Sequence, residues 1–465
     1  MLTLGGSTSH RTCSGVTRRD ALKVGTLGLG GLTLPWWLAR RAEAAAGDYV
    51  RDKSVVLLFL SGGASHIETF NPNMSGPAPA RSVTGEVATR LPGVTFGGTF
   101  PLLAAHAEKM SVVRNYRHPV GDHAKAIMHV LNGGQSNGDR DGDAPSIGSI
   151  VSRLRGANHP RTGMPTFALL DSDEVDPQYN NEKRRVQVAS APGPLGAACA
   201  PFVPGGEGPA MRNLSLNFPR GRVDDRRDLL DRLDHLKRQV DSDRSMESVD
   251  RHTAQAFELI LGSAAQAFDL SQEDPRLLER YDTSSFRVGK KKFRDSQLGR
   301  HFLTARRLIE AGCRFVTIHS AGWDMHADGN NPGIVSGMEM LGRPVDRAVS
   351  AFLEDLSDRG MLGDVLLVVT GDFGRTPRIN DRGGRDHWPK LCTLAFAGGG
   401  LQQGQIIGQS ARGNDEPIGD SISTPNMMST ILHTIFDVGA LRLARGVPRD
   451  LLAAIEEHPP IEPLF

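Results

Sequence analysis

Three apolar runs in this chain are each followed by a carboxylate and an imidazole. The pairs are Glu68 with His66, Asp324 with His326, and Asp372 with His387. Mixed sets of carboxylates and imidazoles suit Zn²⁺ or Mn²⁺, whereas Ca²⁺ prefers oxygen ligands alone. Two such ions about 4 Å apart would clamp the attacking and leaving oxygens of a phosphoryl or sulfuryl displacement. The residue types therefore predict a divalent metal centre with one or two ions, Zn²⁺ or Mn²⁺ being preferred.

Five of these side chains are the predicted metal ligands, namely Glu68, Asp324, His326, Asp372 and His387. Asp324 and His326 are separated by one residue, so in an extended segment their side chains point to the same side. Donor atoms that share one Zn²⁺ lie within about 4.5 Å of one another, and we expect this of Asp324, His326 and His387. Glu68 and Asp372 are expected to face each other across the neighbouring metal position.

Further polar residues in the same loops have predicted supporting roles. Arg375 is placed to hold the remaining oxygens of an ester anion in a bidentate contact. Asp122 and His123 open a predicted helix, whose N-terminus attracts anions, and we expect them to assist the chemistry. The competing interpretation is a solvated loop whose charges are incidental. Three more residues complete the predicted edge of the site: Ser65, His66 and Asp386.

The apolar runs at 53–60, 314–319 and 365–369 must position these side chains. They are short and bounded by polar or glycine residues, which predicts strands buried on both faces of a parallel sheet. Ligands bind beyond the carboxyl ends of the strands in such open sheets. Further strands are expected at 111–114, 165–170 and 391–396, and helices at 102–110, from 122 onward, and at 145–154, 298–309, 340–356 and 424–436. The predicted fold is therefore α/β, with a mostly parallel sheet sandwiched by helices.

Two stretches between the predicted strands interrupt this pattern. Residues 171–222 are rich in Pro, Gly and polar residues without a steady period, which predicts an irregular excursion. Residues 223–312 carry helical stripes, one of them made by Leu229, Leu233 and Leu236, which predicts a helical insertion. Both stretches belong to one α/β domain that spans 47–465.

The first 46 residues have the features of a signal peptide. Arg18 and Arg19 precede an apolar run at 24–38, and small residues follow at 44–46. This is the twin-arginine form of an export signal. The apolar run is shorter than the about 20 residues that span a bilayer, so we expect cleavage and no stable membrane span. The predicted location is periplasmic or extracellular.

Composition excludes several classes of protein. The formal net charge is +1, which gives no indication of nucleic-acid binding. The mean hydropathy of −0.29 excludes a polytopic membrane protein. The oligomeric state stays open at this point.

Four motifs make the sequence similar to a known family. In chain order they read SGGASHIETFNP at 61–72, GWDMH at 322–326, TGDFGRTP at 370–377 and GGRDHWP at 383–389. In this order after a twin-arginine leader, they closely resemble the exported bacterial family known as Domain of Unknown Function 1501, particularly its planctomycete members. The resemblance spans about 57–439, and the family is part of the alkaline-phosphatase-like superfamily.

The resemblance implies an alkaline-phosphatase-like fold and a metal-dependent hydrolase of phosphate or sulfate esters. It places Glu68, Asp324, Asp372 and His387 at metal positions of the superfamily, with His326 closer to Asp324 than is usual. Phe373 stands where the superfamily has a histidine ligand. The implied substrate is a small-molecule or polysaccharide ester. The alternative is a non-catalytic extracytoplasmic module that binds a metal or a partner on the same fold.

Overall fold

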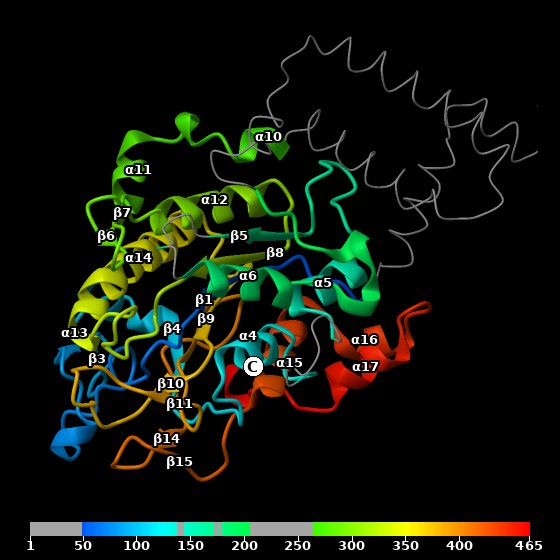
Figure 1. Ribbon diagram of the computed structural model, residues 1–465. Helices are drawn as coiled ribbons and strands as arrows, with labels where there is room; N and C mark the ends of the chain where they lie inside the picture. The colour runs from blue at the N-terminus through cyan, green and yellow to red at the C-terminus, as the bar shows by residue number, and fades with distance from the viewer. Residues whose placement is uncertain (1–48, 137–143, 172–175, 177–178, 205–263) are drawn as a thin grey trace, which may run out of the picture.

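The computed structural model describes residues 49–136, 144–171, 176, 179–204 and 264–465 (Figure 1). The predicted leader at 1–46 and the predicted helical stripe that begins at Leu229 lie outside these residues. Among the residues that are described, no helix has the length and apolar character needed to cross a bilayer.

A seven-stranded sheet forms the centre of the molecule. In spatial order its strands are β13 (Ile406–Ile407), β4 (Met110–Val113), β12 (Leu394–Gly398), β9 (Val365–Gly371), β1 (Ser54–Leu60), β8 (Phe315–Ser320) and β5 (Phe167–Leu170). Both antiparallel pairs involve β12, and the other four pairs are parallel. The predicted mostly parallel sheet is confirmed.

The interior strand β1 shows why these runs become buried strands. Its side chains alternate between two cores on opposite faces of the sheet, Val56, Leu58 and Leu60 on one face and Val55, Leu57 and Phe59 on the other. Fully burying one such side chain contributes roughly 1.5–3 kcal/mol. A strand with this pattern is stable only where helices cover both of its faces.

Helices cover both faces, as the predicted sandwich requires (Figure 1). One layer contains α3 (Pro101–Ala104), α10 (Ala264–Ala267), α11 (Pro275–Tyr281), α12 (Leu298–Glu310), α13 (Ile334–Gly337) and α14 (Arg343–Asp358). The other contains α4 (His123–Leu131), α5 (Ile147–Arg155), α6 (Asn180–Ala189), α15 (Thr424–Ile435), α16 (Val438–Leu443) and α17 (Arg449–Glu456).

The predicted helical insertion is described only from residue 264 onward. Its last helix, α12, packs against α14 and β8 through Phe302, Ala305 and Ile309, so it covers the sheet directly. The helices α10 and α11 flank α12, and a short hairpin, β6 (Arg287–Val288) and β7 (Arg294–Asp295), lies between α11 and α12.

The described part of the predicted excursion at 171–222 contains one regular helix, α6. Only three of its ten residues are buried, namely Glu182, Val186 and Ala189. Because only three positions are buried and one of them is charged, the helix has too few apolar residues for its period to be recognised in the sequence. Residues 205–222 of the predicted excursion lie outside the described part.

Short hairpins complete the loops at the carboxyl edge of the sheet. They pair β2 (Glu86–Ala88) with β3 (Thr95–Gly97), β10 (Gly374–Arg375) with β11 (His387–Trp388), and β14 (Gln409–Ser410) with β15 (Pro417–Ile418). The pair β10 and β11 follows β9 directly and places Arg375 opposite His387. The loops after β1, β8 and β9 thus meet at one edge.

Candidate metal centre

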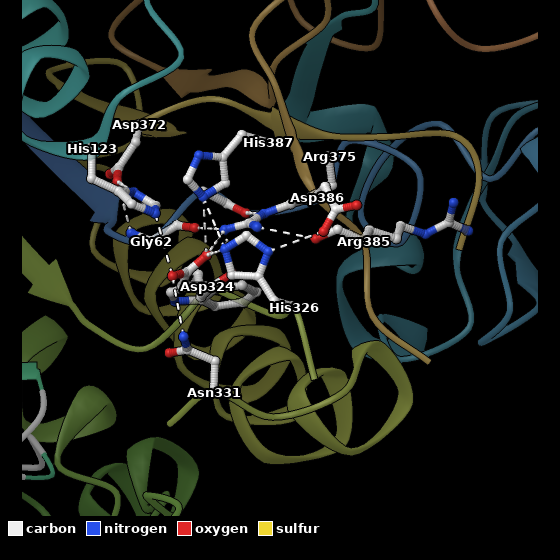
Figure 2. Close-up of polar contacts among 12 residues, drawn as sticks. Gly62, His123, Asp324, His326, Asn331, Asp372, Arg375, Arg385, Asp386 and His387 are labelled. Atoms are coloured by element: carbon white, nitrogen blue, oxygen red, sulfur yellow. Dashed lines mark hydrogen bonds and ion pairs between the residues drawn. The ribbon is translucent and has the colours of Figure 1, made fainter. Parts of the chain in front are cut away.

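Four side chains from three separate segments converge at this edge (Figure 2). They are His123, Asp324, His326 and His387, and their ligand atoms all lie within 4.8 Å of one another. His123 is the first residue of α4, Asp324 and His326 lie in the loop after β8, and His387 lies on β11. In the part of the chain that is described, this group alone could hold a metal ion with at least three such ligands.

The spacing of the ligand atoms fits one ion. His326 Nε2 lies 2.7 Å from Asp324 Oδ1, and His387 Nε2 lies 3.0 Å from His326 Nε2. His123 Nε2 lies 3.3 Å from Asp324 Oδ2. Ligands held about 2.0–2.1 Å from a tetrahedral Zn²⁺ are about 3.3 Å apart. The expected proximity of Asp324, His326 and His387 is confirmed, and His123 joins them.

The other ring nitrogen of each histidine is held from outside the cluster. A ligand histidine that donates its Nδ1–H to an acceptor directs the lone pair of Nε2 toward the metal. The Nδ1 contacts are His123 with Asp372 Oδ2 at 2.7 Å, His326 with Asp386 Oδ1 at 3.3 Å, and His387 with the carbonyl oxygen of Gly121 at 3.0 Å. All three imidazoles are therefore oriented for binding through Nε2.

Two side-chain donors and the neighbouring backbone of Gly62 hold Asp324 in its orientation. Arg375 Nη2 lies 2.6 Å from its Oδ1, and Asn331 Nδ2 donates to its Oδ2 at 3.3 Å. Gly62, with a φ of +101°, lies so near that a Cβ there would be 2.5 Å from the backbone nitrogen of Asp324. A glycine is therefore required where the loop after β1 passes the cluster.

The electrostatic environment of the cluster favours the exchange of a bound proton for a metal cation. Burial alone would raise the pKa of Asp324, but hydrogen bonds from the three imidazoles and the charge of Arg375 hold it far below its usual value. Burial would lower the pKa of His123, but its hydrogen bonds to Asp324 and Asp372 raise it to about 9. At neutral pH His123 carries a proton that a divalent ion would displace.

The cluster is accessible from solvent. The exposed fractions of the four side chains run from 14% for Asp324 to 29% for His387, with His123 at 15% and His326 at 18%. A small anion can therefore reach an ion held here.

Glu68 is not part of the cluster, which corrects its prediction as a ligand. It is fully buried and forms an ion pair with Arg385, whose Nη2 lies 2.8 Å from its Oε1. Its Oε2 accepts hydrogen bonds from Ser82 and Thr84. Asp372 contacts His123 and the backbone nitrogen of Gly62, so the expected pairing of Glu68 with Asp372 is wrong. A buried carboxylate needs such partners, and they occupy its oxygens.

Asp372 contacts the cluster through His123, and its predicted role as a ligand stays a prediction. It is fully buried, and its Oδ2 accepts from the backbone nitrogen of Gly62 at 3.0 Å as well as facing His123 Nδ1. The group of four possible ligands does not include Asp372.

Two predicted catalytic residues have other roles. Arg375 is fully buried, and it donates to the carbonyl oxygens of Gly62 and Gly63 as well as to Asp324, so it does not present a free fork to an anion. Asp122 caps α4 by accepting from the backbone nitrogen of Lys125 at 3.1 Å. Arg375 thus orients Asp324, and Asp122 caps the helix that begins with His123.

The three predicted edge residues lie in different environments. Asp386 is exposed beside the cluster and contacts His326. Ser65 is buried in the loop after β1, where its carbonyl oxygen accepts from the hydroxyl of Thr69 at 2.8 Å. His66 is buried with its Nε2 3.1 Å from the carbonyl oxygen of Asn414, and burial lowers its pKa to about 4. Only Asp386 lies at the site.

Sequence reasoning missed His123 as a ligand and Asn331 as a support of Asp324. His123 follows an N-cap residue, a position that places a side chain at the open end of a helix and could have indicated its role. Asn331 carries no such signal, because its contact depends on how the loop folds back after His326.

Comparisons with solved structures find similar chains at low identity. A protein of glycosaminoglycan metabolism from Bacteroides thetaiotaomicron shares 11% identity and a TM-score of 0.41, with 89% of this chain and 76% of that chain covered. A lipoteichoic acid synthase from Listeria monocytogenes shares 10% and 0.38, covering 85% and 77%. A phosphonate monoester hydrolase from Silicibacter pomeroyi shares 12% and 0.36, covering 82% and 73%.

A family model supplies the classification. No curated protein sequence matches the chain significantly. The model described as "Protein of unknown function (DUF1501)" matches residues 52–438, a range that includes all four motifs and every residue of the cluster. The chain belongs to the DUF1501 family, as its motifs predict.

Proposed function

We propose that the protein is an exported, metal-dependent hydrolase of phosphate or sulfate esters. The convergence of three imidazole Nε2 atoms and one carboxylate in a solvent-accessible cluster carries this proposal. His123, Asp324, His326 and His387 would hold one ion, with Zn²⁺ or Mn²⁺ as the candidates. When bound, such an ion supplies Lewis-acid polarisation of an ester oxygen and lowers the pKa of a water molecule.

The protein's own residues prepare this site. Asp372 and Asp386 hold the Nδ1 atoms of His123 and His326, so the rings do not need to reorient when an ion or substrate arrives. Arg375 fixes the carboxylate of Asp324 and offsets its charge in the buried part of the site. The loop after β1 packs closely against the backbone of Asp324.

Export and substrate class form part of the proposal. The predicted twin-arginine leader at 1–46 supports a periplasmic or extracellular location. The family resemblance supports a small-molecule or polysaccharide ester as the substrate.

A non-catalytic metal-binding module is the second candidate. The cluster offers four protein ligands, and four protein ligands are typical of structural zinc sites, whereas catalytic sites usually have three and a water. Phe373, where a histidine ligand was expected from the superfamily, packs against the rings of His123 and His387 at 4.8 and 4.5 Å between centroids. Both observations favour a single ion held by four protein ligands.

The decisive experiment combines elemental analysis of the purified mature protein with ester hydrolysis assays. We expect about one Zn²⁺ or Mn²⁺ per chain, and metal-dependent hydrolysis of aryl phosphate or aryl sulfate. His387→Ala should lose the metal and the activity, whereas His433→Ala, on α15, should keep both. One ion per chain without hydrolysis of either ester would establish the binding module, and a metal-free protein that takes up neither ion would refute both.

A further inference from the structure

A row of buried polar side chains extends from the metal centre across neighbouring strands. Ser61 directly follows β1, His319 lies near the end of β8, and Asp171 directly follows β5. These three strands are adjacent in the sheet. Ser61 and His319 are fully buried and Asp171 is 9% exposed. The row therefore lies inside the protein.

Short hydrogen bonds connect the row end to end. Asp171 Oδ1 lies 2.7 Å from His319 Nδ1, and His319 Nε2 lies 2.6 Å from Ser61 Oγ. Ser61 Oγ also lies 2.8 Å from Oε2 of Glu182, which α6 supplies from the other side. The same Glu182 oxygen accepts from the backbone nitrogen of Gly322 at 3.2 Å. Ser61 is thus the link between an imidazole and a carboxylate.

The contacts of Ser61 call for one further proton, which either Glu182 or His319 can carry. The Nδ1–H of His319 donates to Asp171, so the hydroxyl of Ser61 has two contacts to satisfy with one hydrogen. In one arrangement, protonated Glu182 donates to Ser61 Oγ and the Ser61 hydroxyl donates to His319 Nε2. In the other, His319 Nε2–H donates to Ser61 Oγ and the hydroxyl donates to the Glu182 carboxylate. Every hydrogen bond is made in both arrangements.

Conversion between the two arrangements conserves atoms and electrons. The Glu182 O–H bond breaks as Ser61 Oγ takes up that proton, and the original hydroxyl proton of Ser61 passes to His319 Nε2. The reverse transfer restores the first arrangement. Ser61 itself is fully buried with both sides of its oxygen engaged, so it is not placed to attack an ester.

The charges around Glu182 couple this proton to the metal centre. Burial raises the pKa of Glu182 to about 7, and the charge of Asp372 adds to this effect, whereas His123 lowers the pKa. At the far end, Gln187 donates to Asp171 at 2.6 Å and Lys183 Nζ lies 4.0 Å from it. The charge of the cluster therefore influences the protonation of Glu182. Gln187 and Lys183, both on α6, stabilise the carboxylate of Asp171.

We propose that Glu182, Ser61, His319 and Asp171 form a proton relay that responds to the charge of the metal centre. A cation at the centre favours ionised Glu182 and drives the shared proton through Ser61 to His319. This inference deepens the proposed function, on which the identity of the cation rests. In a hydrolase, the relay would return the proton to Glu182 when an anionic substrate offsets the charge of the ion.

Nitrogen NMR of the full mature protein, labelled with ¹⁵N-histidine, tests the relay directly. The ¹⁵N shift of His319 Nε2 reports whether that nitrogen carries a proton, and the signal is assigned by its loss in His319→Gln. Two triggers are applied separately, one equivalent of Zn²⁺ to the metal-free wild type, and Asp372→Asn in metal-free protein. Both reduce the negative charge near Glu182, so each should protonate His319 Nε2.

Ser61→Ala is the matched control, since it removes one oxygen and interrupts the relay. In this background both triggers should leave His319 Nε2 unchanged, while Zn²⁺ still shifts the signals of His326 and His387. The relay is refuted if His319 ignores both triggers in the wild type, or responds equally in the Ser61→Ala variant. If Zn²⁺ leaves His326 and His387 unmoved, the proposed function fails, and the Asp372→Asn arm still decides the relay.

Discussion

Two carboxylates at the same edge of the sheet, Glu68 and Asp324, have opposite environments. Glu68 is fully buried and faces the permanent cation of Arg385. Asp324 is partly exposed and faces three imidazoles, which can lose their protons and bind a metal. A carboxylate in a conspicuous motif thus marks a metal site only where its neighbours can exchange a proton for an ion.

Breaking the buried ion pair of Glu68 and Arg385 should have the largest effect on stability. Glu68→Gln leaves the guanidinium of Arg385 buried without its counter-charge, and losing one partner of a buried pair costs about 3–5 kcal/mol. Chemical denaturation should show this loss in the free energy of unfolding. Zn²⁺ affinity, measured by isothermal titration calorimetry on the folded variant, should stay within a few-fold of wild type. A loss of Zn²⁺ binding would return Glu68 to the metal centre.

The pH dependence of stability should distinguish the two regions next. The pKa of His123 is raised to about 9 in the folded protein, from an ordinary value of 6.5. Its contribution to stability is therefore fully present below about pH 6.5 and is lost as the pH rises through about 9. At about 1.4 kcal/mol per pKa unit, the loss is at most about 3.5 kcal/mol.

Thermal denaturation of the metal-free protein between pH 6 and 10 measures this change. The melting temperature should fall more steeply in wild type and in Glu68→Gln than in His123→Asn. If His123→Asn follows the wild-type curve, the proton at the cluster is not on His123.

The outer partners of the histidines should give smaller and graded effects. Asp372 is buried and 2.7 Å from His123, whereas Asp386 is exposed and 3.3 Å from His326. Loss of a buried outer partner typically reduces metal affinity about 10–100-fold, and we expect this of Asp372→Asn. Asp386→Asn should cost less than about tenfold, because water replaces an exposed partner. Zn²⁺ titrations of both variants test the order, and equal effects would show that burial does not set it.

The sequence alone determined the strands and the edge at which they end. The runs that became β1, β8 and β9 are buried at every position, and only a strand covered on both faces can bury such a pattern. Strands β4, β5 and β12 were also located, whereas the two-residue strand β13 was missed, being too short to show a period. Because parallel strands end together, Asp324, His326 and His387 could be assigned to one metal position.

Which of the other candidates join that position depends on contacts between segments that are distant in the sequence. Glu68 and Asp324 both lie in motifs after buried strands. Arg385 pairs with Glu68 and not with Asp324, although it lies 317 residues from Glu68 along the chain. Glu182 reaches the edge from a helix with almost no apolar period, and His123 comes from the helix α4. Contacts of this kind depend on where distant loops cross, and a local pattern of residues carries no information about such crossings.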